Sequence, residues 1–412
     1  MTIEFAASDR STVGIEWELQ LIDAETNDLR SDADTLLRAL EQSGQTDHRI
    51  VKEMLRNTIE LVSVPARNVS ECTKDLQRLL SQVKPFAKEM GLVLATAGSH
   101  PFAHPQDQEV TDSVRYSSLV NRTRYWGQQM LLFGVHVHVG IEDVEKVLPI
   151  QRALSTTLGQ LIAISASSPY WDGIDTDYAS NRTMMFQQLP TAGIPRQFDT
   201  WEEFSDFTDQ MIRANAISTV DELRWDVRPS PKFGTLEVRA FDAATNLQEV
   251  GAFAALTQCL VEHFSRRIDA GEPLDFFPDW YIAENKWRAA RFGLDAELIV
   301  DSHGGRQIAR EWLINVVAEL RAIAIELGCL EELDRVGAIA RHGGAYERIR
   351  HSVHTGQVPG HKLRDHHIRE VPAQIPFRPL GAVRTESPLA SPNLFLAVDH
   401  MREEMEIGHP IW

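Results

Sequence analysis

Acidic, basic and imidazole side chains recur at alternate positions in several segments of this 412-residue chain. In the first segment, residues 12–23, Glu16 and Glu18 share one face of an alternating pattern, TVGIEWELQLID. Strict alternation over this length predicts a half-buried β-strand. Residues two apart in a strand lie about 6.5–7 Å from each other along the chain. Taken alone, the stretch favours an ordinary strand with two glutamates on a solvated face.

Three more predicted strands repeat this arrangement, and they carry Glu60 (residues 56–66), His138 (residues 134–141), and Glu237 with Arg239 (residues 235–242). Each motif alone has a common structural explanation. An H-x-H motif in a strand is often a structural or zinc-binding pair, and an E-x-R motif is often a cross-strand ion pair. If the polar faces of the four strands coincide, however, they form one cup lined by four carboxylates and an imidazole.

Such a cup predicts a metal site that handles phosphate. Two carboxylates about 4 Å apart repel each other by roughly 4 kcal/mol at an effective dielectric constant near 20, and a divalent cation removes that repulsion. Oxygen ligands with one imidazole favour Mg²⁺ or Mn²⁺ over Zn²⁺. An arginine such as Arg239 suits a phosphoryl group in transfer. The chain contains no glycine-rich phosphate-binding motif, so a nucleotide would be held by metals and arginines.

The elements around these strands indicate an α+β fold. Periodicity predicts helices over residues 32–43, 70–91 (capped by Ser70 and kinked or split at Pro85), 122–133 and 144–167 (broken at Pro149). Residues 92–98 read as a strand, residues 225–230 and 235–242 as a hairpin, and residues 169–195 as an irregular loop. The motif Thr200-x-x-Glu203 opens a further helix, and residues 246–350 read as almost entirely helical. Strands followed by helices, without regular alternation, favour α+β over α/β.

The predicted domain organisation is one catalytic domain over residues 1–353 and a C-terminal extension over residues 354–412. The extension begins with a run rich in Pro, His and Arg (354–392), predicted to be poorly ordered, and ends with a helix (393–407). Cys72, Cys259 and Cys329 are isolated from one another in sequence, which indicates buried thiols in a reducing compartment rather than a disulfide framework.

Composition limits the partners. A formal net charge of −18 argues against a nucleic-acid backbone or an anionic membrane as partner, because both require a basic surface. No secretory signal pattern opens the chain, and no apolar run reaches the roughly 18 residues that span a membrane. The sequence therefore predicts a soluble cytoplasmic protein without a nucleic-acid or membrane partner.

Six segments in a fixed order carry a resemblance to a known family: VGIEWELQLID, MLRNTIELVS, HVHVGI, DYASNR, WDVRPSPKFGTLEVRAFD and NKWRAARFGL. They resemble the carboxylate–amine ligases of the glutamate–cysteine ligase type 2 family, over roughly residues 10–350. The resemblance implies a glutamine synthetase-like fold, with a curved antiparallel sheet of about six strands, helices packed behind it and a helical C-terminal half. One departure is Trp17, which stands where the family often has a third glutamate and whose position predicts that it faces the core.

The resemblance also implies a reaction. ATP phosphorylates a carboxylate, typically the γ-carboxyl of glutamate, and an amine such as that of cysteine then displaces phosphate to form an amide. ATP would be the co-substrate, and Mg²⁺ or Mn²⁺ the cofactor.

Site residues follow from the same resemblance. The implied metal ligands are Glu16, Glu18, Glu60, His138 and Glu237, with Glu53 as a further acidic ligand. Glu237 and Arg239 are the implied catalytic residues, with Arg239 on the γ-phosphate. Arg182 is implied to hold the substrate carboxylate, and Arg228, Asn285 and Arg288 to lie near the nucleotide or substrate.

Two other functions fit the same residues. Carboxylates with a histidine also activate water, so a metal-dependent hydrolase is one alternative. A non-catalytic relative that binds metal or nucleotide is the other. The apparent strand edges and the C-terminal helix suggest a homodimer.

Overall fold

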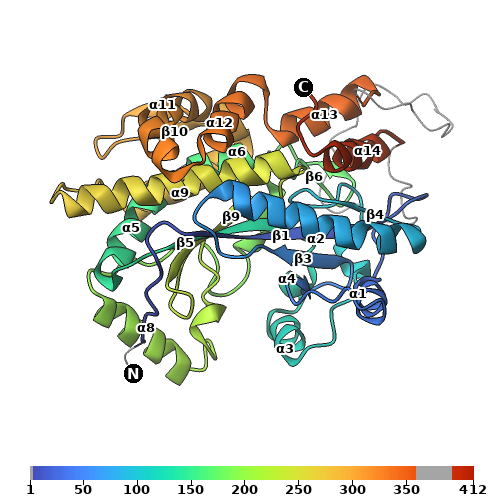
Figure 1. Cartoon of the computed structure of the whole chain (residues 1–412), viewed down its shortest axis with the longest axis horizontal. Helices are drawn as coiled ribbons and strands as arrows, with labels where there is room; N and C mark the ends of the chain where they lie inside the picture. The colour runs from blue at the N-terminus through green and yellow to red at the C-terminus, as the bar shows by residue number, and fades with distance from the viewer. Residues whose placement is uncertain (1–2, 359–391) are drawn as a thin grey trace.

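A computed structural model describes residues 3–358 and 392–412 (Figure 1). Its centre is a seven-stranded sheet in the order β2-β3-β1-β5-β9-β8, with β4 also pairing with β1. All of these pairs are antiparallel. The strands are β1 (Val13–Asp23), β2 (Ile50–Lys52), β3 (Thr58–Val62), β4 (Leu92–Ala95), β5 (Gly134–Gly140), β8 (Val227–Ser230) and β9 (Thr235–Asp242). The predicted α+β fold is confirmed.

Alternation in β1 divides the sheet into two faces, as predicted. Ile15, Trp17 and Leu19 are buried in the main core, and the indole Nε1 of Trp17 donates a hydrogen bond to the carbonyl of Ala244 (3.1 Å). Helices α2 (Val69–Glu89) and α9 (Leu247–Asp269) pack on this apolar face (Figure 1). The opposite face of β1 is therefore left for Glu16 and Glu18.

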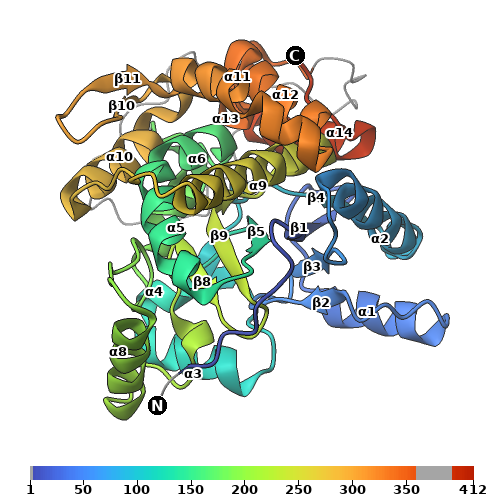
Figure 2. The same ribbon diagram turned by 60° about the vertical axis from the view of Figure 1, so that its left-hand side comes forward.

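The C-terminal helices and two earlier ones lie on the same side of the sheet as α9 (Figure 2). They are α10 (Asp279–Phe292), α11 (Ala309–Leu327), α12 (Leu330–His342), α13 (Ala345–Thr355) and α14 (Pro392–Ile407), together with α5 (Val144–Thr156) and α6 (Leu158–Ser165) from earlier in the chain. Helices α3 (Val114–Thr123), α4 (Tyr125–Gln128) and α8 (Trp201–Arg213) lie on the other side. The remaining α-helices and strands of the described residues are α1 (Ala33–Gln42), α7 (Asn181–Phe186), and the small hairpins β6–β7 (Tyr170–Trp171, Ile174–Asp175) and β10–β11 (Glu297–Ile299, Arg306–Ile308).

Several local predictions are confirmed, and others are wrong. The β8–β9 hairpin forms, and the side chain of Thr200 caps α8 by accepting the N–H of Glu203. Asn68, not Ser70, caps α2. Neither proline ends its helix, because α2 runs through Pro85 and α5 through Pro149, and the break comes at Thr157.

Tertiary packing explains why α5 continues through Pro149. A proline inside a helix removes one hydrogen bond and costs about 3 kcal/mol. Leu148 and Ile150 flank Pro149 and are fully buried, and each such side chain contributes about 1.5–3 kcal/mol. The helix predicted over residues 122–133 is also wrong beyond α4, because Leu131 and Phe133 enter the core in an extended segment.

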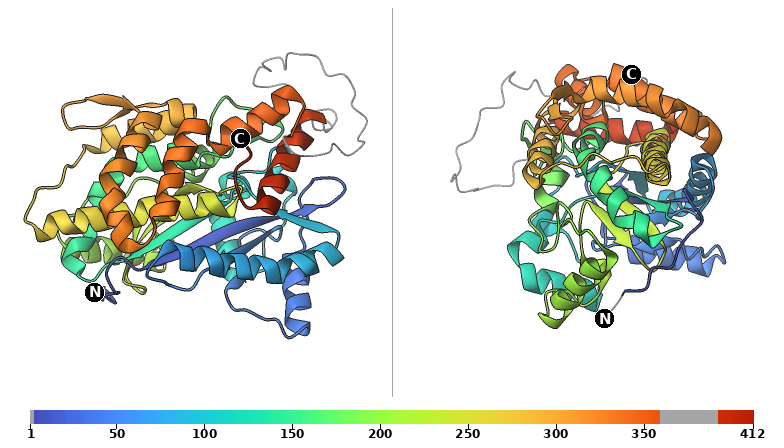
Figure 3. Two further views of the ribbon diagram at one scale, coloured as in Figure 1. Left: turned by 45° about the horizontal axis from the view of Figure 1, so that its top comes forward. Right: turned by 90° about the vertical axis from the view of Figure 1, so that its left-hand side faces the viewer.

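Helix α14, from the predicted C-terminal extension, packs against α13 and β4 (Figure 3). Arg348 of α13 binds Glu404 of α14 (Nε–Oε1, 2.7 Å) and Glu249 of α9 (Nη2–Oε1, 2.8 Å), and all three side chains are buried. Residues 359–391, which make up most of the predicted Pro-, His- and Arg-rich run, lie outside the described residues. No helix among the described residues is long and apolar enough to cross a membrane.

Replacing Arg348 with Ala should lower the free energy of unfolding by about 3–5 kcal/mol, because two buried carboxylates lose their shared cation. Urea denaturation followed by circular dichroism measures the change. Arg321→Ala is the matched control, since Arg321 forms an exposed pair with Asp334 (3.0 Å) that contributes about 0–1 kcal/mol. Equal small effects of the two substitutions would contradict a structural role for the buried cluster.

Candidate active site

Strand register brings the predicted acids and His138 together on the polar face of the sheet. Glu18 of β1 pairs directly with Glu60 of β3, and His138 of β5 pairs with Glu237 of β9. A cavity of about 330 Å³ opens over this face, and Glu16, Glu18, Glu53, Glu60, His138 and Arg239 are among the residues that line it. Glu237 lies beneath the cavity and is fully buried.

His136 is a site residue that the sequence-based assignment left out. It pairs with Glu16 across β1 and β5, and its Nδ1 lies 2.9 Å from Glu16 Oε2. The other oxygen of the same carboxylate, Oε1, lies 3.3 Å from His138 Nε2. Glu16 is thus held between two imidazoles. The signal was present in the sequence, because His136 and His138 share one face of the alternating strand.

Three overlapping groups of side chains have the composition of divalent-cation sites. In each group the three possible ligand atoms lie within 4.8 Å of one another, and the groups are Glu16–His138–Glu237, Glu16–Glu60–His136 and Glu18–Glu53–Glu60. Carboxylate oxygens with one imidazole are the donors that Mg²⁺ and Mn²⁺ accept. The residues present therefore fit hard divalent cations.

Electrostatics divide the site into two parts. Burial, reinforced by the neighbouring Glu53 carboxylate, raises the pKa of Glu18 to about 8. Burial also raises the pKa of Glu53, and burial together with the charge of Glu16 raises that of Glu60 well above its usual value. These three acids lack enough positive charge nearby to stay ionised together. A bound cation would supply that charge and replace their protons.

The other part of the site is already ionised. Burial opposes the charge of Glu16, but hydrogen bonds to His136 and His138 outweigh it and hold the pKa of Glu16 well below its usual value. Burial likewise opposes the charge of Glu237, but the guanidinium groups of Arg239 and Arg228 keep its pKa low. Burial and the charge of Arg239 lower the pKa of His136 to about 4, so this imidazole is neutral near pH 7 and free to bind a metal.

Two arginines bind Glu237, but they differ in how many of their N–H donors are already used. Arg228 donates Nε and Nη2 to Glu237 Oε2 (2.9 and 2.6 Å) and Nη1 to the carbonyls of Asp221 and Leu223. Arg239 binds Glu237 Oε1 through Nη1 alone, and its buried Nε has no hydrogen-bond partner among the described residues. Arg239 therefore keeps donors for an anion in the cavity.

Arg182 lies behind this arrangement rather than on the cavity wall. Its two terminal nitrogens donate to the carbonyl of Arg239 (3.2 Å each), and a Cβ at Gly134 would come within 2.4 Å of its Nη2. The N–H of Gly134 in turn binds Glu18 Oε2 (2.5 Å). Arg182 thus supports the backbone that positions both Arg239 and Glu18, next to the acidic end of the site.

Asn285 and Arg288 are not brought to the cavity. The side chain of Asn285 forms two 2.8 Å hydrogen bonds with the backbone of Ile299, and Arg288 donates to the carbonyl of Glu297 (2.8 Å). Both residues therefore fix α10 to the β10 strand. The cavity is also lined by residues to which the sequence analysis gave no role, among them Arg115, Tyr116, Arg224, Lys232 and Phe233. These come from a short helix, a turn and a loop, where no periodic pattern marks a face.

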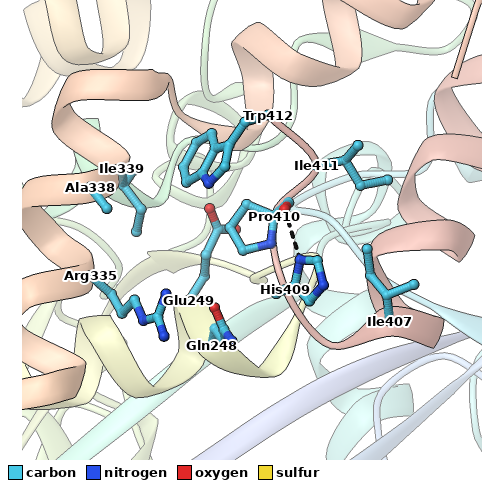
Figure 4. A pocket seen from close by; sticks show the side chains of 10 residues that line it. All are labelled: Gln248, Glu249, Arg335, Ala338, Ile339, Ile407, His409, Pro410, Ile411 and Trp412. Carbon is cyan, nitrogen blue, oxygen red and sulfur yellow. Dashed lines mark hydrogen bonds between the residues drawn. The ribbon is translucent and has the colours of Figure 1, made fainter. Parts of the chain in front are cut away.

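A second cavity of about 480 Å³ lies between α9, α12 and the C-terminal tail (Figure 4). Its walls include Arg335, Ile339 and Trp412. All the candidate metal groups of the described residues lie at the first cavity. The first cavity is therefore the candidate active site.

An antiparallel sheet with helices behind it carries, on its open face, a cup of acids, histidines and arginines that suits an enzyme acting on phosphate groups with divalent cations. A family model described as "Glutamate-cysteine ligase family 2 (GCS2)" matches residues 12–366. The chain belongs to this family and is an ATP-dependent ligase.

Relatives and solved structures agree with this placement. A Mycobacterium sp. (strain KMS) protein with the provisional name glutamate–cysteine ligase 2-1 is 49% identical over 348 residues, which is 84% of this chain and 92% of the relative. A protein of Mycolicibacterium smegmatis with the same provisional name is 47% identical, over 84% and 92% of the two chains.

Among solved structures, a glutamate–cysteine ligase of Francisella tularensis in complex with AMP has a TM-score of 0.57 at 12% identity, over 85% of this chain and 86% of that one. A bifunctional glutathione synthetase of Pasteurella multocida also has a TM-score of 0.57, at 13% identity, over 95% and 52% of the two chains. At these identities the two structures establish the shared fold.

Proposed function

We propose that this protein joins the γ-carboxyl group of glutamate to an amine such as that of cysteine, with Mg²⁺ or Mn²⁺ as cofactor. One observation carries the proposal: three overlapping groups of candidate cation ligands lie beside Arg239, whose buried Nε has no hydrogen-bond partner in the described part of the chain. Phosphoryl transfer requires positioning and charge neutralisation more than covalent help from the protein. The side chains that line the cavity can position the reacting groups and neutralise their charge.

The first step transfers phosphate. A carboxylate oxygen of the substrate attacks the γ-phosphorus of ATP, the bond to the bridging oxygen breaks, and ADP leaves. Arg239 lies at the cavity wall, where it would stabilise the charge on the transferring group. Divalent cations would supply positive charge to the phosphate oxygens, and the side chains that would hold those cations are Glu16, Glu18, Glu53, Glu60, His136, His138 and Glu237.

The second step forms the amide. The amine nitrogen attacks the carbonyl carbon of the acyl phosphate, phosphate leaves, and the nitrogen loses a proton. No protein nucleophile is required. Cys72, Cys259 and Cys329 are all buried outside the cavity, as predicted, and burial raises the pKa of Cys72 to about 11. The thiols therefore serve as core residues.

ADP release measured with ATP, Mg²⁺ and single or paired L-amino acids tests the proposal. Release that requires glutamate and increases with one particular amine supports it and identifies the acceptor. ATP-independent cleavage of a phosphoester or peptide would favour the hydrolase instead. Tight Mg²⁺ or ATP binding without any turnover would favour the non-catalytic relative.

Arg182→Ala should lower kcat by about 10-fold or more and change the two KM values less, because Arg182 supports the backbone that positions Arg239 and Glu18 and does not line the cavity. Loss of a charge-assisted hydrogen bond costs about 1.5–3 kcal/mol, and each 1.4 kcal/mol is a factor of ten. Steady-state kinetics with each substrate varied in turn measure kcat and both KM values. Arg288→Ala is the control, since Arg288 lies outside the cavity and donates instead to the carbonyl of Glu297. An increase in KM for the carboxylate substrate that exceeds the loss in kcat would place Arg182 in the carboxylate pocket instead.

A further inference from the structure

The turn between β8 and β9 presents an aromatic ring at the mouth of the candidate active site. Phe233 is 55% exposed and, with Lys232, lines the cavity. Its ring lies edge-on to that of His138, at a centroid distance of 6.0 Å. His138 belongs to a candidate cation site with Glu16 and Glu237. The exposed ring is therefore adjacent to the place where phosphate groups would bind.

The backbone of this turn is held on both sides. The hydroxyl of Ser8 donates to the carbonyl of Phe233 (2.7 Å), and the N–H of Ala6 donates to that of Pro231 (2.9 Å). On the other side the N–H of Ile141 donates to the carbonyl of Gly234 (3.0 Å).

Gly234 permits this close packing. It has φ +63°, and a Cβ there would lie 1.6 Å from the Ala6 carbonyl oxygen. Phe233 thus extends from a turn fixed by its neighbours, and its exposure does not result from a loose loop.

Positive charge surrounds the same part of the cavity. The ammonium group of Lys232 lies 5.2 Å from the centre of the Phe233 ring, and Arg224 and Arg228 line the cavity from the same chain segment. A ligand that matches this region has a flat aromatic part and several negative charges. A nucleoside triphosphate has both.

Resting on the proposed function, we propose that Phe233 is the stacking platform for the nucleobase and that Lys232 contacts the phosphate chain. If the phosphate groups of a nucleotide lie next to His138, its base can lie at the mouth of the cavity, against the Phe233 ring. An aromatic ring stacks on any base, because every base has a π-face. The prearranged turn limits the ordering that binding requires.

Phe233→Ala tests the platform in the full-length protein. Loss of one base–aromatic stack should raise KM for ATP by about 10-fold, within the roughly 5- to 150-fold range that such losses span. Affinity for inorganic tripolyphosphate, measured by calorimetry with Mg²⁺, should change less than about twofold, because tripolyphosphate has no base. Phe233→Tyr should restore the native KM for ATP, and Trp280→Ala, which removes an exposed aromatic outside the cavity, should leave it unchanged.

Two outcomes would overturn the platform: an unchanged KM for ATP in Phe233→Ala, or an equal loss of affinity for ATP and tripolyphosphate. The equal loss would mean that Phe233 acts by shaping the metal end of the cavity. Failure of the proposed function is a separate result, seen as no amino-acid-dependent ADP release by the native protein. In that case calorimetry still tests the platform, because the affinities for MgATP and for tripolyphosphate can be compared between the native protein and Phe233→Ala.

Discussion

Glu16→Gln should lower kcat by about 1,000-fold or more while the fold remains intact. Glu16 is shared by two of the three candidate cation groups, and its two oxygens face His136 and His138 separately. Glutamine keeps the volume of the side chain but has no charge and only one oxygen. Losing several kcal/mol of charge stabilisation at a cation site corresponds to about three powers of ten in rate.

The measurement is kcat for ADP release across a wide Mg²⁺ range, together with the midpoint of thermal unfolding. Glu202→Gln is the matched control, because Glu202 is exposed on α8. Glu237→Gln should abolish turnover as well, but it also leaves Arg228 and Arg239 without their carboxylate, so its effect mixes catalysis with stability. A kcat for Glu16→Gln within a few-fold of the native value would refute the metal assignment.

Alternation explains why so much of this site could be predicted from the sequence. In a strand the side-chain period is two, so β1 must present Glu16 and Glu18 together once Trp17 is buried. The same rule applies to Glu60 in β3 and to Glu237 in β9. One face of four strands could therefore be assigned without knowing how the strands pair.

The pairing register of the strands could not be predicted from the sequence, and this register determines which candidate ligands lie next to each other. The contact between Glu16 and His136 depends on the pairing of β1 with β5, whose positions are more than 100 residues apart in sequence. A register irregularity between Val135 and Val137 where β5 meets β9 further shifts His136. Local pattern contains no information on such long-range alignment, so the sequence alone could not choose between the two histidines.

Residues outside regular strands were missed for a related reason. Tyr116 reaches Glu53 (3.4 Å) from α3, and Phe233 reaches the cavity from a turn. Neither residue lies in an alternating strand pattern, which would have assigned its side chain to one face of the sheet. Local rules failed where packing opposed them, as at Pro149, whose helix continues because its neighbours fill the core.

Arg239→Lys should lower kcat by about 1,000-fold, with a much smaller effect on KM for ATP. An arginine that stabilises a transferring phosphoryl group contributes about 10³–10⁵ in rate. The Arg239 guanidinium binds Glu237 through one terminal nitrogen, and its buried Nε has no partner among residues 3–358 and 392–412, so one planar group can hold the carboxylate and contact phosphate together. A lysine ammonium has a single nitrogen, so it cannot bind the carboxylate and the phosphate through separate nitrogens held in one plane.

Arg228→Lys is the matched control, because the two arginines share Glu237 as a partner. All three nitrogens of the Arg228 side chain already donate within the protein, to Glu237, Asp221 and Leu223, which leaves one N–H of Nη2 at most for a substrate. Its replacement should lower kcat by at most about tenfold, the size of one weakened charge-assisted hydrogen bond. Steady-state kinetics of the two variants side by side measure the difference. Equal losses would mean that both arginines act only by holding Glu237, and that a different group stabilises the transferring phosphate.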